Sequence, residues 1–477
     1  MYWTALDLFI QISFKWFVIR NLRNYFCFMK TALISKNVIT PSGLKEAVIV
    51  IEDGFIRDVL KYQVDKEFEI TDYGELIIMP GLIDTHVHIN EPGRTDWEGF
   101  ETATKSAAAG GITMLVDMPL NSSPVTTTVK GLNEKTEAAK NKLYVDCGFY
   151  GGLIPGNINE LEGLIMNGVF GLKAFMVDSG IEEFPFVNEI DLRKALSIIS
   201  GYEIPLLVHA EIDCGFEKIT GYDEFSYDSF LSKRPDEWEI KAIKLLIKLC
   251  REFNFHIHIV HLSSYEAIEL IREAKNEGLK LTVETCPHYL IFSSNDISCN
   301  DTRFKCTPPI RNKANREKLW TAVKEGVIDF IVSDHSPCDP DLKCLEEGNF
   351  ENAWGGISGL QLGLSAVWTE ARKRGFSVED VSRLMSRNTA SFIGLGNSAG
   401  KIEKGFEANL TVFDPDKRFM VNEEKLYHKH KLTPYSGMEL TGTVEATYLR
   451  GKMIFNNGEI LSSPSGELKK SLNKSGA

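Results

Sequence analysis

The sequence lacks the marks of a disulfide-stapled, membrane-spanning or nucleic-acid-binding protein. Its nine cysteines are odd in number, are scattered over 477 residues and form no Cys-x-x-Cys pair, which indicates free thiols in a reducing compartment. Near the N-terminus the longest uncharged stretch, Leu8–Phe14, is far shorter than the roughly 20 apolar residues that span a bilayer. A net charge of -13 disfavours nucleic acid and anionic membranes as partners, yet it leaves a polar or anionic small molecule open.

Residues 1–28 do not follow the pattern of the rest of the chain. They are rich in aromatic side chains and carry Lys15, Arg20 and Arg23 against one acid, Asp7. No Ala-x-Ala cleavage site follows an apolar core, so we do not expect a secretory signal. The segment is either an organelle-targeting extension or a mis-assigned start, with Met29 as the first residue. A cytoplasmic protein is the main expectation.

The chain contains ample apolar material for a large core, with 43% hydrophobic and 25% charged residues. After short β-like runs over residues 29–79, apolar strand-like runs alternate with helical patterns. The runs are Leu82–Ile89, Ile112–Met118, Leu143–Tyr150, Gly171–Phe175, Pro205–Ala210, Phe255–Leu262, Leu281–Thr285 and Asp329–Ser333. Eight strands alternating with helices over about 250 residues predict an α/β fold, a (β/α)8 TIM-like barrel, here over residues 80–399.

β-like runs return over residues 400–460, at Asn409–Phe413, Thr443–Arg450 and Met453–Phe455. We expect them to pair with residues 29–79 in a small β-sandwich domain built from both chain ends. The remaining residues, 461–477, are rich in serine, glycine and lysine and lack aromatics, so a flexible tail is predicted there.

Side chains that suit a metal ion stand at the predicted carboxyl ends of five strands. His86 and His88 are separated by one residue, so on a strand they point to the same side. The fourth, fifth, sixth and eighth runs supply Lys173, His209, His261 and Asp334. Strand ends of this kind meet at one mouth of a barrel, where active sites lie. Each residue alone has an ordinary structural explanation, but their joint occurrence predicts a divalent-metal centre.

With these residues in place, the chain from about Met29 to Phe455 resembles the metal-dependent amidohydrolases, in particular the cyclic-amidohydrolase branch of dihydroorotases, hydantoinases and allantoinases. The resemblance implies two zinc ions, although other divalent metals would fit similar ligands. His86, His88 and Asp334 would hold one ion, His209 and His261 the other, and Lys173, carboxylated by CO2, would bridge both. Asp334 would also be catalytic, taking a proton from the attacking water and passing it to the leaving nitrogen. A homo-oligomer, tetramer or dimer, is implied too.

Two positions separate the branches. Asn90 stands where dihydroorotases carry an arginine that binds the substrate carboxylate. Asp178 stands where hydantoinases and dihydropyrimidinases carry an oxyanion-stabilising tyrosine, which leaves that donor unidentified. Segments such as Glu91–Phe100, Phe304–Pro309 and Ala353–Ile357 resemble allantoinases instead. The implied reaction is hydrolysis of the uncharged hydantoin ring of allantoin to allantoate, a step of purine breakdown.

A neutral ring is best held by backbone amides and small polar groups. We therefore expect substrate contacts from Asn90, Cys306 and Ser336, while His288 would either touch substrate or serve a structural role. Three other histidines near the predicted strand ends are interpreted as non-ligands: His256, His258 and His335. Two alternatives stay open: a hydantoinase or dihydropyrimidinase, and a non-catalytic scaffold relative, which would lack at least one of the six metal positions.

Overall fold

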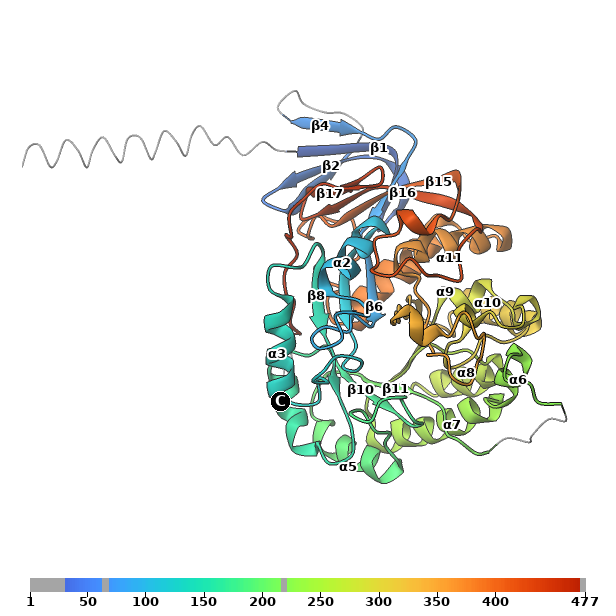
Figure 1. The fold of residues 1–477 in the computed structure, drawn as a ribbon. Coiled ribbons are helices and arrows are strands. Elements are labelled where there is room, and N and C mark those ends of the chain that lie inside the picture. Colours follow the sequence, from blue (N-terminus) through green and yellow to red (C-terminus); the bar gives the residue numbers. More distant parts are fainter. Residues whose placement is uncertain (1–30, 62–67, 216–220, 472–477) are drawn as a thin grey trace, which may run out of the picture.

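The computed structural model describes residues 31–61, 68–215 and 221–471. Strands from both chain ends lie together at one end of the molecule, and the alternating strands and helices fill the rest (Figure 1). The predicted extension or alternative start at residues 1–28 lies outside the described residues.

The two chain ends build one nine-stranded sheet. Its strands are β1 (Thr31–Thr40), β2 (Gly43–Glu52), β3 (Phe55–Leu60), β4 (Glu69–Asp72), β5 (Ile77–Pro80), β15 (Leu410–Met420), β16 (Glu439–Leu449), β17 (Lys452–Asn456) and β18 (Glu459–Ile460). Their order is β18-β17-β16-β15-β5-β1-β2-β3, with β4 beside β1. The antiparallel pairing of β5 with β15 joins the two halves. A β domain made from both chain ends is therefore confirmed.

The predicted barrel is also confirmed, and all its strand pairs are parallel. Its strands are β6 (Leu82–Val87), β7 (Ile112–Asp117), β8 (Asp146–Phe149), β9 (Gly151–Gly152), β10 (Leu172–Phe175), β11 (Leu206–His209), β12 (Ile257–Ile259), β13 (Leu281–Thr285) and β14 (Phe330–Ile331). The third predicted strand is split at Tyr150 into β8, which pairs with β7, and β9, which pairs with β10. A bridge between Val87 and His335, with a 2.8 Å hydrogen bond from His88 N to the His335 carbonyl, closes the ring.

Helices lie outside the barrel strands (Figure 1). They are α2 (Phe100–Ala109), α3 (Val129–Ala139), α4 (Leu161–Met166), α5 (Glu189–Ile199), α6 (Tyr227–Ser232), α7 (Asp236–Phe253), α8 (Ile268–Asn276), α9 (Pro287–Ile291), α10 (Lys313–Lys324), α11 (Gly363–Ala371), α12 (Val378–Ser382) and α13 (Asn388–Phe392). In α7, Ala242, Leu246 and Leu249 recur at helical spacing and face the core, and three acids occupy the first turn. None of the helices in the described part combines the length and apolar character needed to cross a membrane.

The described part of the predicted tail packs against the barrel. Residues 466–471 run beside β8, with hydrogen bonds from Gly466 N to the Leu143 carbonyl and from Cys147 N to the Glu467 carbonyl. Lys469 and Arg450 both pair with the buried carboxylate of Asp146. A buried carboxylate needs such partners, so this cluster fixes the segment in a way that local composition could not indicate.

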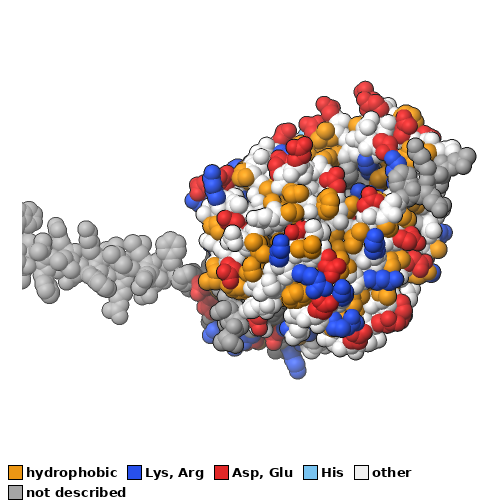
Figure 2. Space-filling model, turned by 90° about the horizontal axis from the view of Figure 1, so that it is seen from below, with side chains coloured by type: hydrophobic (Ala, Val, Ile, Leu, Met, Phe, Trp, Pro, Cys, Tyr) orange, Lys and Arg blue, Asp and Glu red, His pale blue; other side chains and the backbone are white. Residues whose placement is uncertain are grey.

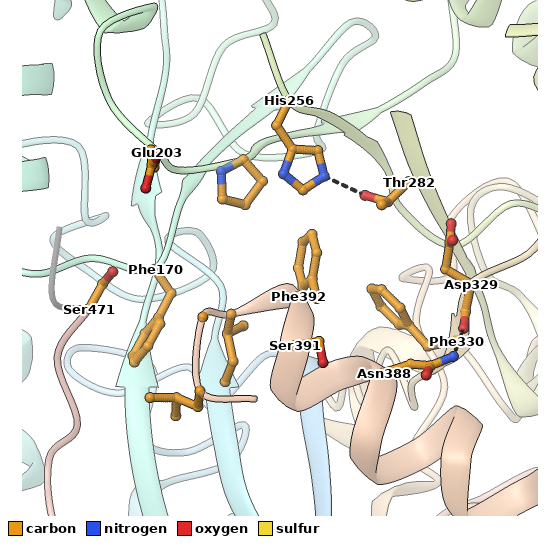
Figure 3. A pocket seen from close by; sticks show the side chains of 14 residues that line it. Phe170, Glu203, His256, Thr282, Asp329, Phe330, Asn388, Ser391, Phe392 and Ser471 are labelled. Carbon is orange, nitrogen blue, oxygen red and sulfur yellow. Dashed lines mark hydrogen bonds between the residues drawn. The ribbon is translucent and has the colours of Figure 1, made fainter. Parts of the chain in front are cut away.

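On the face shown in Figure 2, acidic and basic side chains are interspersed with apolar ones. One cavity lies at the amino-terminal ends of β10–β14 and has a volume of about 650 Å³. Phe170, Phe330 and Phe392 surround it, together with His256, which is hydrogen-bonded to Thr282 (Figure 3). This basal cavity is at the opposite end of the barrel from the predicted metal ligands, because it lies where the strands begin.

Candidate metal centre

All six predicted ligands are buried at the carboxyl-terminal mouth of the barrel. Donor atoms of His86, His88 and Asp334 lie within 4.8 Å of one another. The His86 ring centroid is 5.4 Å from that of His261, which is 4.6 Å from the ring of His209. Lys173 completes the cluster, since it lies close enough for its positive charge to lower the pKa of both His209 and His261. The barrel thus brings together residues spread over about half the chain.

The backbone is bent at the ends of two of these strands. His261 has φ +39° and Asp334 has φ +45°, a left-handed conformation that side-chain-bearing residues rarely adopt. Two neighbours at the mouth, Asn90 and Asn121, share it with φ +67° and +65°. Such strain persists only where the surroundings hold it in place, and it gathers at functional sites.

Carboxylates behind the histidines select which ring nitrogen can bind a metal. Glu284, in the interior of β13, accepts a hydrogen bond from His86 Nδ1, so that His86 Nε2 faces Asp334 Oδ1 at 3.2 Å. Glu211 lies 2.6 Å from His209 Nε2 and 2.6 Å from Arg234, which leaves His209 Nδ1 for the metal. Carboxylate partners of this kind fix the tautomer and raise the basicity of metal-binding histidines.

Neighbouring histidines keep Glu284 ionised. Burial alone would raise its pKa, but the neighbouring His86 and His258 outweigh burial and lower the pKa to about 2. His258 Nε2 bonds the second Glu284 oxygen at 3.0 Å, and its Nδ1 bonds Thr282. His258 therefore supports Glu284 from behind and does not face the mouth with the predicted ligands.

The surroundings of Lys173 disfavour the ammonium form of its side chain. Its Nζ is fully buried and has no hydrogen-bond partner among the described residues. Burial lowers the pKa of Lys173 to about 7. The neutral amine is the form that can react with CO2, and a carbamate would place two oxygens that share one negative charge at this unpartnered position. Four imidazoles, one carboxylate and such a carbamate form a donor set that fits two divalent ions.

Asp334 is held as an anion. Burial opposes its ionisation, but His86, His88 and His261 keep its pKa well below the usual range. The Ser336 hydroxyl donates to Asp334 Oδ1 at 2.8 Å and so fixes the carboxylate. A charged, oriented carboxylate beside the metal ligands can accept a proton from water.

The cavity at the mouth is small, about 60 Å³, and it includes two of the three predicted substrate contacts. Cys306 and Ser336 line it, together with Thr307 and Trp354. Asn90 is not among the lining residues, because it is fully buried and its Nδ2 donates to the Pro337 carbonyl at 3.0 Å. Asn90 thus ties the loop after β6 to the loop after β14. The metal ligands, and not cavity size, locate the site.

Other predicted positions have structural partners. Asp178 points outward and accepts a hydrogen bond from Gly180 N. Its neighbour Ser179 lines the cavity, but its hydroxyl donates to the Phe184 carbonyl at 2.7 Å. His335 Nε2 lies 3.3 Å from Glu98, and its Nδ1 accepts from Gly359 N. The oxyanion donor therefore stays unassigned.

One further residue supports the cavity wall and was missed from the sequence. Lys343 is buried, and its ammonium donates to the carbonyls of Lys305 at 3.3 Å, Trp354 at 3.0 Å and Gly356. These carbonyls belong to the two loops that carry Cys306 and Gly355 into the cavity. Lys343 follows Pro340 in a short polar segment that gives no sequence signal for burial.

The model of the amidohydrolase family matches residues 77–454, and the chain belongs to that family. Among the relatives to which this chain is similar are several allantoinases. The allantoinase of Arabidopsis thaliana is 46% identical over 456 residues, 91% of this chain and 90% of the relative. The allantoinase of Saccharomyces cerevisiae is 44% identical over 442 residues, 89% of this chain and 95% of the relative.

A relative from Aquarana catesbeiana, named as a mitochondrial allantoinase, is 50% identical over 76% of this chain and 75% of its own length. Among solved structures, an L-hydantoinase (dihydropyrimidinase) from Arthrobacter aurescens matches with TM-score 0.87 and 28% identity, covering 93% of this chain and 100% of that one. A D-hydantoinase structure matches with TM-score 0.83 and 26% identity, covering 93% and 99%.

Proposed function

We propose that this chain hydrolyses the hydantoin ring of allantoin to give allantoate. The observation that carries the proposal is the buried cluster of six metal-ligating side chains at the barrel mouth, in a chain 44–50% identical to several allantoinases. Asn90 in place of an arginine and Asp178 in place of a tyrosine favour this ring over those of the sister branches.

Two divalent ions, zinc being favoured by the histidine-rich ligands, would supply Lewis acidity that polarises the ring carbonyl and acidifies water. His86, His88 and Asp334 would hold one ion, and His209 and His261 the other. Lys173, as a carbamate, would bridge both. Its missing hydrogen-bond partner supports this role.

The protein's own groups then move the proton and hold the ring. Asp334 takes a proton from the attacking water as the C–O bond forms. It passes that proton to the ring nitrogen as the C–N bond breaks. The new carboxylic acid releases its remaining proton to solvent, so the products are a carboxylate and a neutral ureide nitrogen. Cys306 and Ser336 line the cavity beside Asp334, and Ser336 also orients its carboxylate.

The assembly and location are part of the same proposal. We place the enzyme in the cytoplasm as a homo-oligomer, a tetramer or a dimer, acting on a small molecule. The basic, aromatic character of residues 1–28 and the name of the Aquarana catesbeiana relative make mitochondrial delivery the alternative. Localising full-length and Met29-initiated chains fused to a fluorescent protein would separate the two.

The test is turnover of racemic allantoin by the purified protein loaded with zinc or manganese and bicarbonate. Hydantoin, dihydrouracil and dihydroorotate would be run alongside. Allantoate as the product, with little turnover of the other rings, supports the proposal. Turnover of hydantoin or dihydrouracil without allantoin would instead favour the hydantoinase alternative, which the similar hydantoinase structures keep in view.

A further inference from the structure

A second group of metal-ligating atoms lies behind the predicted centre. Cys286, at the end of β13, and His288, in α9, bring their donor atoms within 4.8 Å of one another and of Asp334. All three residues are buried. Cys286 and His288 do not line the mouth cavity, so two of the three donors lie outside the space available to substrate, while Asp334 lines it.

His288 has no structural partner that would explain its burial. Its side chain is 1% exposed, and neither ring nitrogen has a hydrogen-bond partner among the described residues. The ring packs edge-on against Tyr289 with centroids 4.2 Å apart, a contact that leaves both nitrogens unused. A buried polar group without a partner is costly, and native structures usually provide one.

The three donors select a class of ion. A thiolate is a soft ligand and an imidazole is intermediate, so the pair prefers zinc or cadmium over magnesium, calcium or manganese. The thiolate and the Asp334 carboxylate together neutralise a divalent charge. Binding would release the Cys286 thiol proton to solvent, because a thiolate is the ligating form.

We propose that Cys286, His288 and Asp334 form an additional site for a thiophilic divalent ion. Because Asp334 belongs to both groups, an ion held there withdraws its carboxylate from the catalytic centre. Excess zinc or cadmium therefore inhibits the enzyme, whereas manganese does not. Only this inhibitory consequence depends on the proposed function; the binding itself does not.

The binding is tested by titrating the zinc-loaded protein with cadmium and recording the ultraviolet charge-transfer band of a cadmium–thiolate bond. The six ligands of the predicted centre include no sulfur, so the band reports a site outside it. We expect about one cadmium ion per chain to produce the band. Cys286→Ser should abolish this band, and His288→Asn should weaken cadmium binding at least about tenfold, because each removes a ligand.

Cys306→Ser is the matched control, since Cys306 is also a buried thiol at this end of the barrel but belongs to no such group. It should keep the band. A band that survives Cys286→Ser, or one that Cys306→Ser removes, would overturn the proposal. If Cys286→Ser does not fold, as judged by circular dichroism, the His288→Asn titration decides alone.

An activity measurement then addresses the shared aspartate. Excess zinc should inhibit allantoin turnover by the parent protein and inhibit Cys286→Ser much less, each relative to its own rate with manganese. Equal inhibition of both would refute the sharing of Asp334. If neither protein turns over allantoin, the proposed function fails, while the cadmium band still decides the binding site.

Discussion

Replacing Glu284 by glutamine removes one negative charge behind His86 while keeping the size of the side chain. Glu284 touches three groups: His86 Nδ1, His258 Nε2 at 3.0 Å and the backbone N of His261 at 3.3 Å. Glutamine offers one oxygen where the carboxylate offers two. It also presents an amide donor toward one of these partners, all of which donate to Glu284. The metal-facing histidines therefore lose both orientation and basicity.

The size of the effect can be bounded from the structure. The lowering of the Glu284 pKa from 4.5 to about 2 corresponds to about 3 kcal/mol of net stabilisation of the carboxylate by its surroundings. Only part of this acts through His86, so 3 kcal/mol is an upper limit. Partners of metal-binding histidines typically contribute 10–100-fold in metal affinity, about 1.4–2.7 kcal/mol. We expect Glu284→Gln to weaken metal binding within that range.

The assay is competition for the metal by a chelator, with metal content read by atomic emission. Asp146→Asn is the matched control, because Asp146 is an equally buried carboxylate that binds Arg450 and Lys469 at the other end of the barrel. It should lower the melting temperature and leave metal affinity unchanged. Glu284→Gln binding both ions as tightly as the parent protein would refute the assignment of Glu284 to the metal centre.

Three further outcomes are expected. Lys173→Ala should lose bound metal, as measured by atomic emission, and lower turnover of the metal-loaded protein at least about 1000-fold, because it removes the bridge between the two ions. Lys343→Met should raise KM at least about tenfold with unchanged metal content, because the loops lose the ammonium that holds their carbonyls. Lys275→Met is the control: it removes a similar ammonium from Val327 and Asp329 and should leave KM unchanged. Burial lowers the pKa of His256 to about 4, so as the pH falls the imidazole is protonated in the unfolded chain before it is protonated in the folded protein. The free energy of unfolding should therefore decrease between pH 6.5 and pH 4, by at most about 3 kcal/mol. His256→Asn should make the free energy of unfolding, measured with denaturant, less dependent on pH in this range.

The strands and the six ligands could be predicted because both leave local signals. Buried parallel strands are short apolar runs, and a polar residue at the end of such a run stands out, as His209 does after Leu206 to Val208. Glu284 stands out less. In β13 it is one polar residue in a strand that also carries Thr282 and Thr285, and only the neighbouring strands show that it faces the histidines.

Contacts between different segments of the chain could not be predicted. Asn90 is predicted to contact substrate from its place after the histidine pair, and its Nδ2 also donates to the carbonyl of Pro337, 247 residues away. The tail seemed flexible from its composition, yet Asp146, buried more than 300 residues earlier, fixes Lys469. The burial of Lys343 also depends on partners outside its own segment, since it is held by three carbonyls that lie 11 to 38 residues away. No local pattern contains these partners.

Asp334 is assigned to metal binding, to proton transfer and to the proposed inhibitory site, and its surroundings explain how one carboxylate can serve these roles. Ser336 fixes it from its own loop, so its orientation does not depend on a bound ion. His86 and His88 lie 3.2 and 3.5 Å from its Oδ1, and the donor atoms of Cys286 and His288 lie within 4.8 Å of its carboxylate. Its backbone is left-handed, with φ +45°, which turns the chain sharply at that residue. Metal binding, proton transfer and the proposed inhibition therefore compete for one residue.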